Sequence, residues 1–201
     1  MAQRAVSRDS RGNAAVELAV FAPVLLLLIL ATTDLVQSLR AQMRLDSAAV
    51  QLGQVVSQCN TINTPGDTAQ FWSYAQSIVG NLGAVTGASA QGAVIVSAVY
   101  SASGTNKVAW QVRTGNVNQS SSVGTAGGTA TIAESFVVPT SQTLLVTEVY
   151  LPRQAWVLSA GLMHGTMPEV LNGTTLFMTR APNATALQQS PTASSLPNCT
   201  A

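Results

Sequence analysis

The sequence contains few charged residues, and their scarcity limits the partners that the protein can bind. Charged residues make up 8% of the 201 positions, and 9 basic residues against 8 acidic ones leave a formal net charge of +1. Lys107 is the single lysine, and no stripe of basic residues alternates with aromatic ones. Proteins that bind nucleic acid need a basic surface to neutralise the phosphates. We therefore expect no nucleic-acid partner.

Side chains that support catalysis or metal binding are also scarce. His164 is the only histidine, and no G-x-S-x-G nucleophile motif accompanies it. Met163 and Met167 lie near His164, but two thioethers and one imidazole are more often ordinary core or surface residues than a copper site. The sequence therefore predicts a protein that is not an enzyme and that binds no cofactor or metal. The glutamates of the C-terminal half show no spacing typical of an acid/base pair: Glu134, Glu148 and Glu169.

Cysteine occurs only twice, at Cys59 and Cys199, which is too few for a zinc site. In the cytosol both would remain free thiols, whereas in an oxidising compartment an even number favours one disulfide. A bond between them would close a loop of about 140 residues and stabilise the fold by roughly 4–5 kcal/mol at most. The alternative is two unpaired cysteines. We expect the bond if the protein is exported.

One long apolar segment lies near the N-terminus. Residues 14–33 form a run of 20 residues, which as an α-helix would span about 30 Å, the thickness of a hydrocarbon core. Arg4, Arg8 and Arg11 precede the run, and Asp34 ends it. Because basic residues favour the cytoplasmic side, we expect a membrane helix with its N-terminus in the cytoplasm and a Ser/Thr-rich body outside.

Three interpretations fit this segment. A cleavable secretory signal needs small residues before the cut, which Ala31 and Thr33 provide, and the product would be a secreted binding or adhesin domain. An uncleaved anchor has the same hydropathy and would hold the body in the periplasm. A prepilin-type signal is instead cut on the cytoplasmic side, so that the apolar helix stays on the mature protein.

Glu17 favours the third interpretation, because a carboxylate at the centre of a bilayer costs roughly 2.5–3.5 kcal/mol, and less near the interface. Gly12 lies five positions before it. A cut after Gly12 would create an α-amine on Asn13, one helical turn from Glu17, which would neutralise the carboxylate within a subunit or between neighbours. The alternative is a glutamate at the interfacial end of an ordinary helix. The spacing alone leaves both explanations open.

The stretch RGNAAVELAVFAPVLLLLILATTDLVQSLR resembles the N-terminus of the TadE/TadF-like pseudopilins of the tight adherence (Flp) pilus system. It matches the family pattern at Gly12, Val16, Glu17 and Pro23, and Asp34 supplies the acidic residue that commonly ends the helix. Near the other end, LLVTEVYLP and TTLFMTRAP more weakly resemble the last strands of the family.

The resemblance implies a function and a set of partners. It implies cleavage between Gly12 and Asn13 by a prepilin peptidase, with Glu17 serving recognition, assembly or both. The protein would be a minor pilin needed for pilus assembly and cell adhesion, held in the inner membrane with its C-terminal domain in the periplasm until it joins the filament. The implied partners are the prepilin peptidase, other pilins or pseudopilins, the inner-membrane assembly platform and the lipid bilayer. The sequence departs from the family at polar Asn13 and in the body between Cys59 and Val138.

The rest of the chain predicts an α+β domain. Helical spacing continues to Gln58. Residues 63–66 break this helix, and Asp67 as N-cap with Gln70 at the capping-box position predicts a second helix, which Gly83 would end. The apolar face of the first helix consists of Leu45, Ala49, Leu52 and Val56.

Beyond the second helix the apolar period changes to two, which predicts strands. We expect strands at 94–100, 108–112, 144–151 and 174–180, a hairpin loop at 101–106, an irregular segment at 115–131 and a short helix at 153–163. The simplest packing is pilin-like, with a long helix on an antiparallel sheet of three or four strands. The predicted parts are a basic leader (1–12), a transmembrane helix (13–34), an extracytoplasmic α+β domain (35–182) and a Pro/Ser/Thr-rich tail (183–201) tethered by the disulfide.

Overall fold

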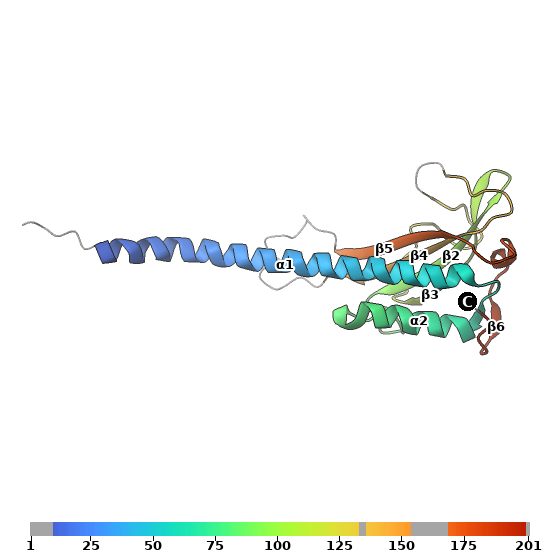
Figure 1. Cartoon of the computed structure of the whole chain (residues 1–201), viewed down its shortest axis with the longest axis horizontal. Helices are drawn as coiled ribbons and strands as arrows, with labels where there is room; N and C mark the ends of the chain where they lie inside the picture. Colours follow the sequence, from blue (N-terminus) through green and yellow to red (C-terminus); the bar gives the residue numbers. More distant parts are fainter. Residues whose placement is uncertain (1–9, 133–135, 154–168, 200–201) are drawn as a thin grey trace, which may run out of the picture. The chain divides into compact units, whose positions relative to one another are not determined.

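The computed structural model describes residues 10–132, 136–153 and 169–199, with side chains from residue 16 onward. Its described residues fall into two units, of which the first contains residues 10–39 and the second contains the others. The elements, shown in Figure 1, are α1 (Ser10–Gln58), β1 (Asn63–Pro65), α2 (Gly66–Val79), η1 (Gly80–Leu82), β2 (Ala93–Ala102), β3 (Thr105–Gly115), β4 (Leu144–Pro152), β5 (Val170–Met178), η3 (Ala186–Gln188) and β6 (Thr192–Ser194).

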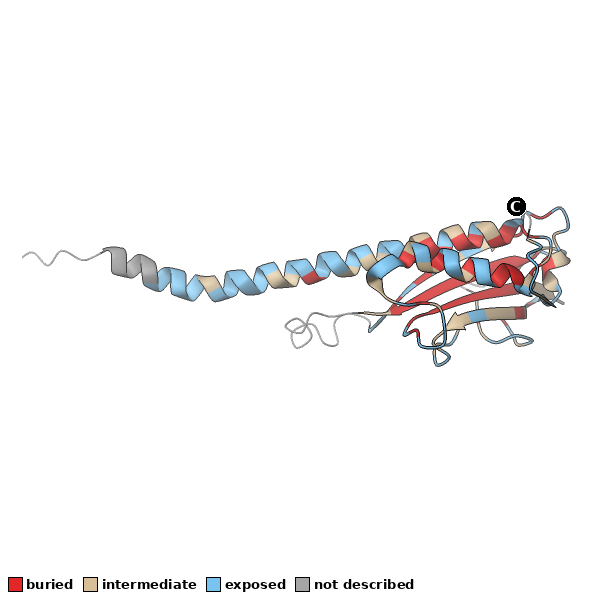
Figure 2. Cartoon of the chain, turned by 90° about the horizontal axis from the view of Figure 1, so that it is seen from below, coloured by how far each residue is buried: buried red, intermediate tan, exposed pale blue. Residues whose placement is uncertain are grey.

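The long N-terminal helix α1 confirms the prediction that helical structure continues from the apolar run to Gln58. By length and composition it is the one described helix that suits a membrane span. Its side chains in the first unit are mostly exposed, as Figure 2 shows. The hydroxyls of Thr32 and Thr33 donate to the carbonyl oxygens of Leu28 and Ile29 at 2.8 and 2.9 Å. Both polar groups are therefore satisfied inside the helix, as a lipid environment requires.

Four antiparallel strands form the sheet, in the order β3-β2-β4-β5. The predicted hairpin between β2 and β3 is present, but its turn consists only of Ser103 and Gly104, both with positive φ (52° and 79°). Turns of this kind match the right-handed twist of the flanking strands. The strand predicted at 174–180 begins earlier, at Val170, because its first residues pair with the end of β4. The helix predicted at 153–163 lies almost wholly outside the described residues.

One face of the sheet carries the main core, which α1 and α2 cover. Leu45 and Leu52 of α1, Ala75 of α2, and Val96 and Leu145 of the sheet are all fully buried in it. A fully buried side chain of this size contributes roughly 1.5–3 kcal/mol of transfer free energy. The predicted apolar face of α1 is therefore the face that anchors the helix to the domain, and the α+β fold class is confirmed.

The opposite face is covered by the long segment between β3 and β4. This segment, predicted as irregular, forms no strand or helix in its described part. It nevertheless contributes Val123, Ala130 and Val138 to a second, smaller core against Val99 and Val146 of the sheet. The sheet is therefore buried on both sides, which explains why its central strand β4 is buried along nearly its full length.

The second helix differs from its predicted start and end. It begins at Gly66, and its N-cap residue is Pro65, without a side-chain capping bond. The prediction that Asp67 caps the helix is wrong, because its carboxylate accepts hydrogen bonds from the backbone of other segments. At the other end α2 stops at Val79, and a 3-10 turn fills the three residues before Gly83.

The C-terminal tail is more ordered than predicted. Residues 192–194 form β6, which pairs in parallel with β1, a segment that we expected only to break a helix. Leu187 of η3 is buried in the main core, and its carbonyl oxygen accepts a hydrogen bond from Trp110 Nε1 at 2.5 Å. A disulfide joins Cys59 to Cys199, as the even cysteine count favours for an oxidising compartment. The tail is thus part of the domain.

The contact between α1 and β5 generates a prediction at Gly173. A methyl group on this residue would lie 2.5 Å from the carbonyl carbon of Leu45 and 2.7 Å from the backbone nitrogen of Asp46. Backbone atoms cannot give way as a flexible side chain can, so Gly173→Ala should lower the free energy of unfolding by about 1–3 kcal/mol. Urea unfolding of the full chain in detergent, followed by tryptophan fluorescence, measures this value.

The control is Thr174→Ala, one residue further along β5, where the side chain is exposed. We expect the control to change stability by less than about 0.5 kcal/mol. Equal stabilities of Gly173→Ala and the unmodified chain would contradict the close approach of the helix backbone to the strand.

Candidate functional site

Glu17 is the only acidic residue on the apolar part of α1 before Asp34. It is exposed, and its apolar neighbours are exposed as well, with 64% for Val16 and 70% for Leu18. A contiguous apolar surface of this kind marks a membrane or protein interaction site. The carboxylate therefore lies within a surface that must be buried elsewhere, and it needs a partner there.

The residues of the predicted cut lie on the same helix. Gly12 and Asn13 belong to the first turns of α1, and Asn13 precedes Glu17 by four positions, which is about one turn. Cleavage after Gly12 would place a positive α-amine at the N-terminus of the helix, near the carboxylate.

Pro23 lies inside α1, and the helix continues through it. Because proline has no N–H, the carbonyl oxygen of Ala19 loses its usual helical donor. Membrane helices tolerate such positions because neighbouring helices, side chains or waters satisfy the released group. Pro23 therefore leaves one backbone carbonyl of α1 without its usual helical donor.

The folded domain contains a buried carboxylate that the sequence did not reveal as a special residue. Glu148 of β4 has no exposed surface. Its Oε1 accepts hydrogen bonds from the Ser122 backbone N–H, the Ser122 hydroxyl and the Tyr150 hydroxyl at 2.9, 2.6 and 2.7 Å. Its Oε2 accepts one from the Ser121 hydroxyl. These four hydrogen-bond donors replace the water that the carboxylate loses on burial. Glu148 therefore attaches the segment between β3 and β4, which covers the sheet, to strand β4.

The pKa of Tyr150 is shifted by this arrangement. It is 6% exposed and donates to Glu148. Burial of the ring, and then the hydrogen bond and negative charge of Glu148, raise the pKa of the Tyr150 hydroxyl to about 12. A signal for this site was present in the sequence, since Glu148 is the one charged residue in a mostly apolar strand and Tyr150 lies on the same face two residues later.

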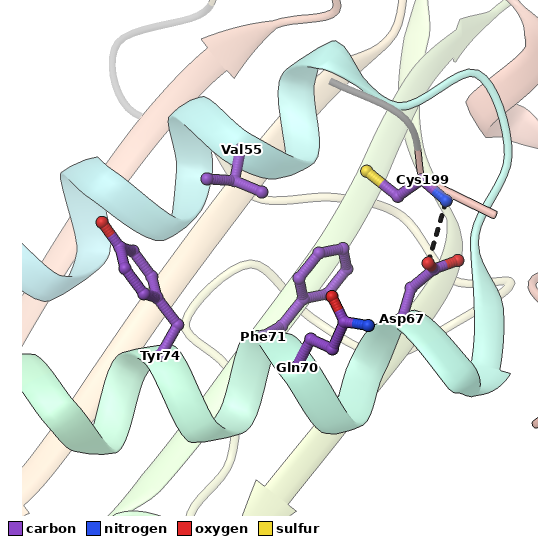
Figure 3. Close-up of a pocket in the computed structure, with 6 residues that line it drawn as sticks. All are labelled: Val55, Asp67, Gln70, Phe71, Tyr74 and Cys199. Carbon is purple, nitrogen blue, oxygen red and sulfur yellow. Dashed lines mark hydrogen bonds between the residues drawn. The ribbon is translucent and has the colours of Figure 1, made fainter. Parts of the chain in front are cut away.

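Asp67 is the second buried carboxylate, at 2% exposure. Its Oδ1 accepts hydrogen bonds from the backbone N–H groups of Asn198 and Cys199 at 2.7 and 2.8 Å, and its Oδ2 accepts one from the Asn63 N–H at 2.6 Å. Asp67 therefore ties the C-terminal tail to the start of α2. Figure 3 shows the bond to Cys199 beside a pocket of about 220 Å³ lined by Val55, Asp67, Gln70, Phe71, Tyr74 and Cys199.

None of these groups forms a metal centre. No cluster of three or more His, Cys, Asp or Glu side chains occurs among the residues with a described position. The Met163, His164 and Met167 group considered in the sequence lies outside those residues, as does Glu134.

Comparison with known proteins identifies the N-terminal segment. Residues 12–53 match the model of the family described as TadE-like protein. This segment is TadE-like. The resemblance drawn from Gly12, Val16, Glu17 and Pro23 is therefore confirmed. No curated protein and no solved structure matches the chain. The matched segment lies on α1, which among the described helices is the one that fits a membrane anchor.

The raised pKa of Tyr150 predicts how stability changes at alkaline pH. Below the ordinary tyrosine pKa of about 10 the hydroxyl is protonated in both states, and its contribution is fully present. Between pH 10 and about 12 the unfolded state releases the proton while the folded state retains it, so stability falls. Tyr150→Phe should remove this part of the decline, and should cost about 1 kcal/mol at neutral pH because Glu148 loses a donor.

Urea unfolding at pH 8 and at several values from 10 to 12 measures both effects. The control is Tyr74→Phe, which removes the hydroxyl of an exposed tyrosine. If Tyr150→Phe and Tyr74→Phe lose stability equally over this pH range, the buried pair does not act as described.

Proposed function

We propose that the protein is a minor pilin, or pseudopilin, needed for assembly of a tight adherence (Flp-type) pilus. Its N-terminus would lie in the cytoplasm, α1 would span the inner membrane, and the domain that follows would lie in the periplasm before it enters the filament. The observation that carries this proposal is the TadE-like match over residues 12–53, which contains both the predicted cut and Glu17. A prepilin peptidase would remove the basic leader 1–12.

The chemistry of α1 supports the proposed processing. The exposed apolar side chains around Glu17 require burial, and burial in lipid would leave its carboxylate without water. Cleavage after Gly12 supplies a positive group at the right end of the helix. The charge would be neutralised within the subunit or by the α-amine of a neighbour, so that assembly and processing depend on each other.

The proposed topology rests on two independent observations. Arg4, Arg8 and Arg11 precede the apolar run, which favours a cytoplasmic N-terminus. The disulfide between Cys59 and Cys199 belongs to the folded domain, and such bonds persist in oxidising compartments such as the periplasm. In this account residues 13–34 cross the membrane, residues 35–182 form the extracytoplasmic domain, and the tail 183–201 is tethered to it.

The proposed partners follow from these parts. The prepilin peptidase would act on Gly12 and Asn13. Other pilins or pseudopilins would pack against α1 through its apolar surface, with Pro23 as a contact point. The assembly platform of the inner membrane would receive the processed subunit. The competing proposals are a secreted adhesin domain cut near Thr33 and an uncleaved membrane-anchored protein.

Replacement of Glu17 tests the assembly role. Glu17→Ala should leave membrane insertion intact, because it removes a charge from an apolar helix. It should reduce pilus output by about tenfold or more, since loss of a charge-assisted contact in a low-dielectric environment corresponds to about 1.5–3 kcal/mol. Membrane fractionation measures insertion, and quantification of sheared surface pili measures assembly.

Val16→Ala is the matched control, because it alters the adjacent position on α1 without a change in charge. We expect normal insertion and nearly normal pilus output from this variant. Full pilus output from Glu17→Ala would contradict the role assigned to Glu17.

A further inference from the structure

The two cysteines of the disulfide differ in how far they are buried. Cys59 follows the end of α1 and is completely buried. Cys199 is partly exposed and lines the pocket between α1 and α2. Cys199 is therefore the cysteine that is accessible to a molecule approaching from outside.

The pocket beside Cys199 opens to the surface at Gln70 and Tyr74, which are both exposed. Figure 3 shows Phe71 and Tyr74 on α2 and Val55 on α1 around the space in front of the cysteine. These walls are uncharged, and the Asp67 carboxylate at one end is occupied by three backbone N–H groups. The pocket has room for the end of a side chain and its walls suit an apolar one.

The backbone at Cys199 is held by contacts that do not involve sulfur. Asp67 binds the N–H groups of Asn198 and Cys199. Two side-chain amides add to this: Asn63 Nδ2 donates to the Leu196 carbonyl oxygen at 2.7 Å, and Asn198 Nδ2 donates to the Thr61 hydroxyl oxygen at 2.5 Å. The parallel pairing of β6 with β1 continues this attachment. All of these contacts are available to the reduced chain, so the tail is able to dock before the bond exists.

We propose that Cys199 is the entry sulfur for thiol–disulfide exchange, and that Asp67 is the positioning residue that holds it against buried Cys59. The partner is an oxidised thiol–disulfide oxidoreductase, whose cysteine end enters the pocket. The Cys199 thiolate attacks a sulfur of the partner's disulfide, which forms a mixed disulfide and releases one partner thiolate. The Cys59 thiolate then attacks Cys199 Sγ, which forms the Cys59–Cys199 bond and releases the second partner thiolate. The chain loses two electrons and two protons, and the partner is reduced to its dithiol.

Single-cysteine variants of the full chain in detergent test the order of attack, with oxidised glutathione as the probe. Cys59→Ser leaves Cys199, and Cys199→Ser leaves Cys59. We expect Cys199 in the folded protein to form the mixed disulfide at least about tenfold faster than Cys59, and the two rates to become equal in urea. Intact mass measures both rates. Equal rates in the folded protein, or no reaction of Cys199 in it, would overturn the proposal.

A second experiment tests the positioning role of Asp67. The full chain with both cysteines is equilibrated with reduced and oxidised glutathione, and the fraction that carries the disulfide is measured. This fraction gives the effective concentration of one cysteine thiol at the other. Asp67→Asn removes the negative charge that the two tail N–H groups bind and turns one of the two acceptor oxygens into a donor, so this concentration should fall about tenfold. Asp46→Asn, at an exposed acid of α1, is the control and should leave it unchanged. An effective concentration that Asp67→Asn does not lower would refute the positioning role, whatever the stability of that variant.

Discussion

The structure depends on one helix, α1, whose two parts have different surroundings. From residue 40 onward, α1 presents a buried stripe to the sheet, with Leu45 and Leu52 fully enclosed. Before residue 40 most of its apolar side chains are exposed. A helix of this composition is stable only when lipid or other helices cover it. The proposed pilin role agrees with this constraint. Lipid would bury the apolar side chains of α1 in the membrane, and the helices of other subunits would bury them in the filament.

Two buried carboxylates hold irregular segments of the folded domain to the sheet and to the helices. Glu148 binds the segment that covers one face of the sheet, and Asp67 binds the tail beside the helices. In both cases a carboxylate receives several backbone or hydroxyl donors, which suits segments that are too poor in apolar residues to pack well alone. Two of the eight acidic residues of the chain therefore each hold a long irregular segment in place.

The regular elements were predictable because their patterns are local. The 3.6-residue period through Leu45, Leu52 and Val56 predicted the helix face, and alternation predicted the hairpin and the central strand. The TadE-like segment was recognisable for the same reason, since Gly12, Glu17 and Pro23 lie within a short stretch. The disulfide was expected on the condition of export.

The long-range contacts were not predictable. The partners of Asp67 lie up to 132 residues away, so its position before a helix favoured the wrong interpretation as an N-cap. Residues 192–194 show no strand pattern, and they form β6 only because β1 lies beside them. The covering segment has too few apolar residues to show a period, although Val123 and Val138 are buried.

N-terminal sequencing of the mature protein from membranes tests the central claim most directly, namely that a cut creates the positive group for Glu17. We predict that the mature chain begins at Asn13. A chain that begins at Asp34 would have lost the apolar helix, and a chain that retains its arginine-rich leader would have no α-amine near Glu17. Either result would contradict the account.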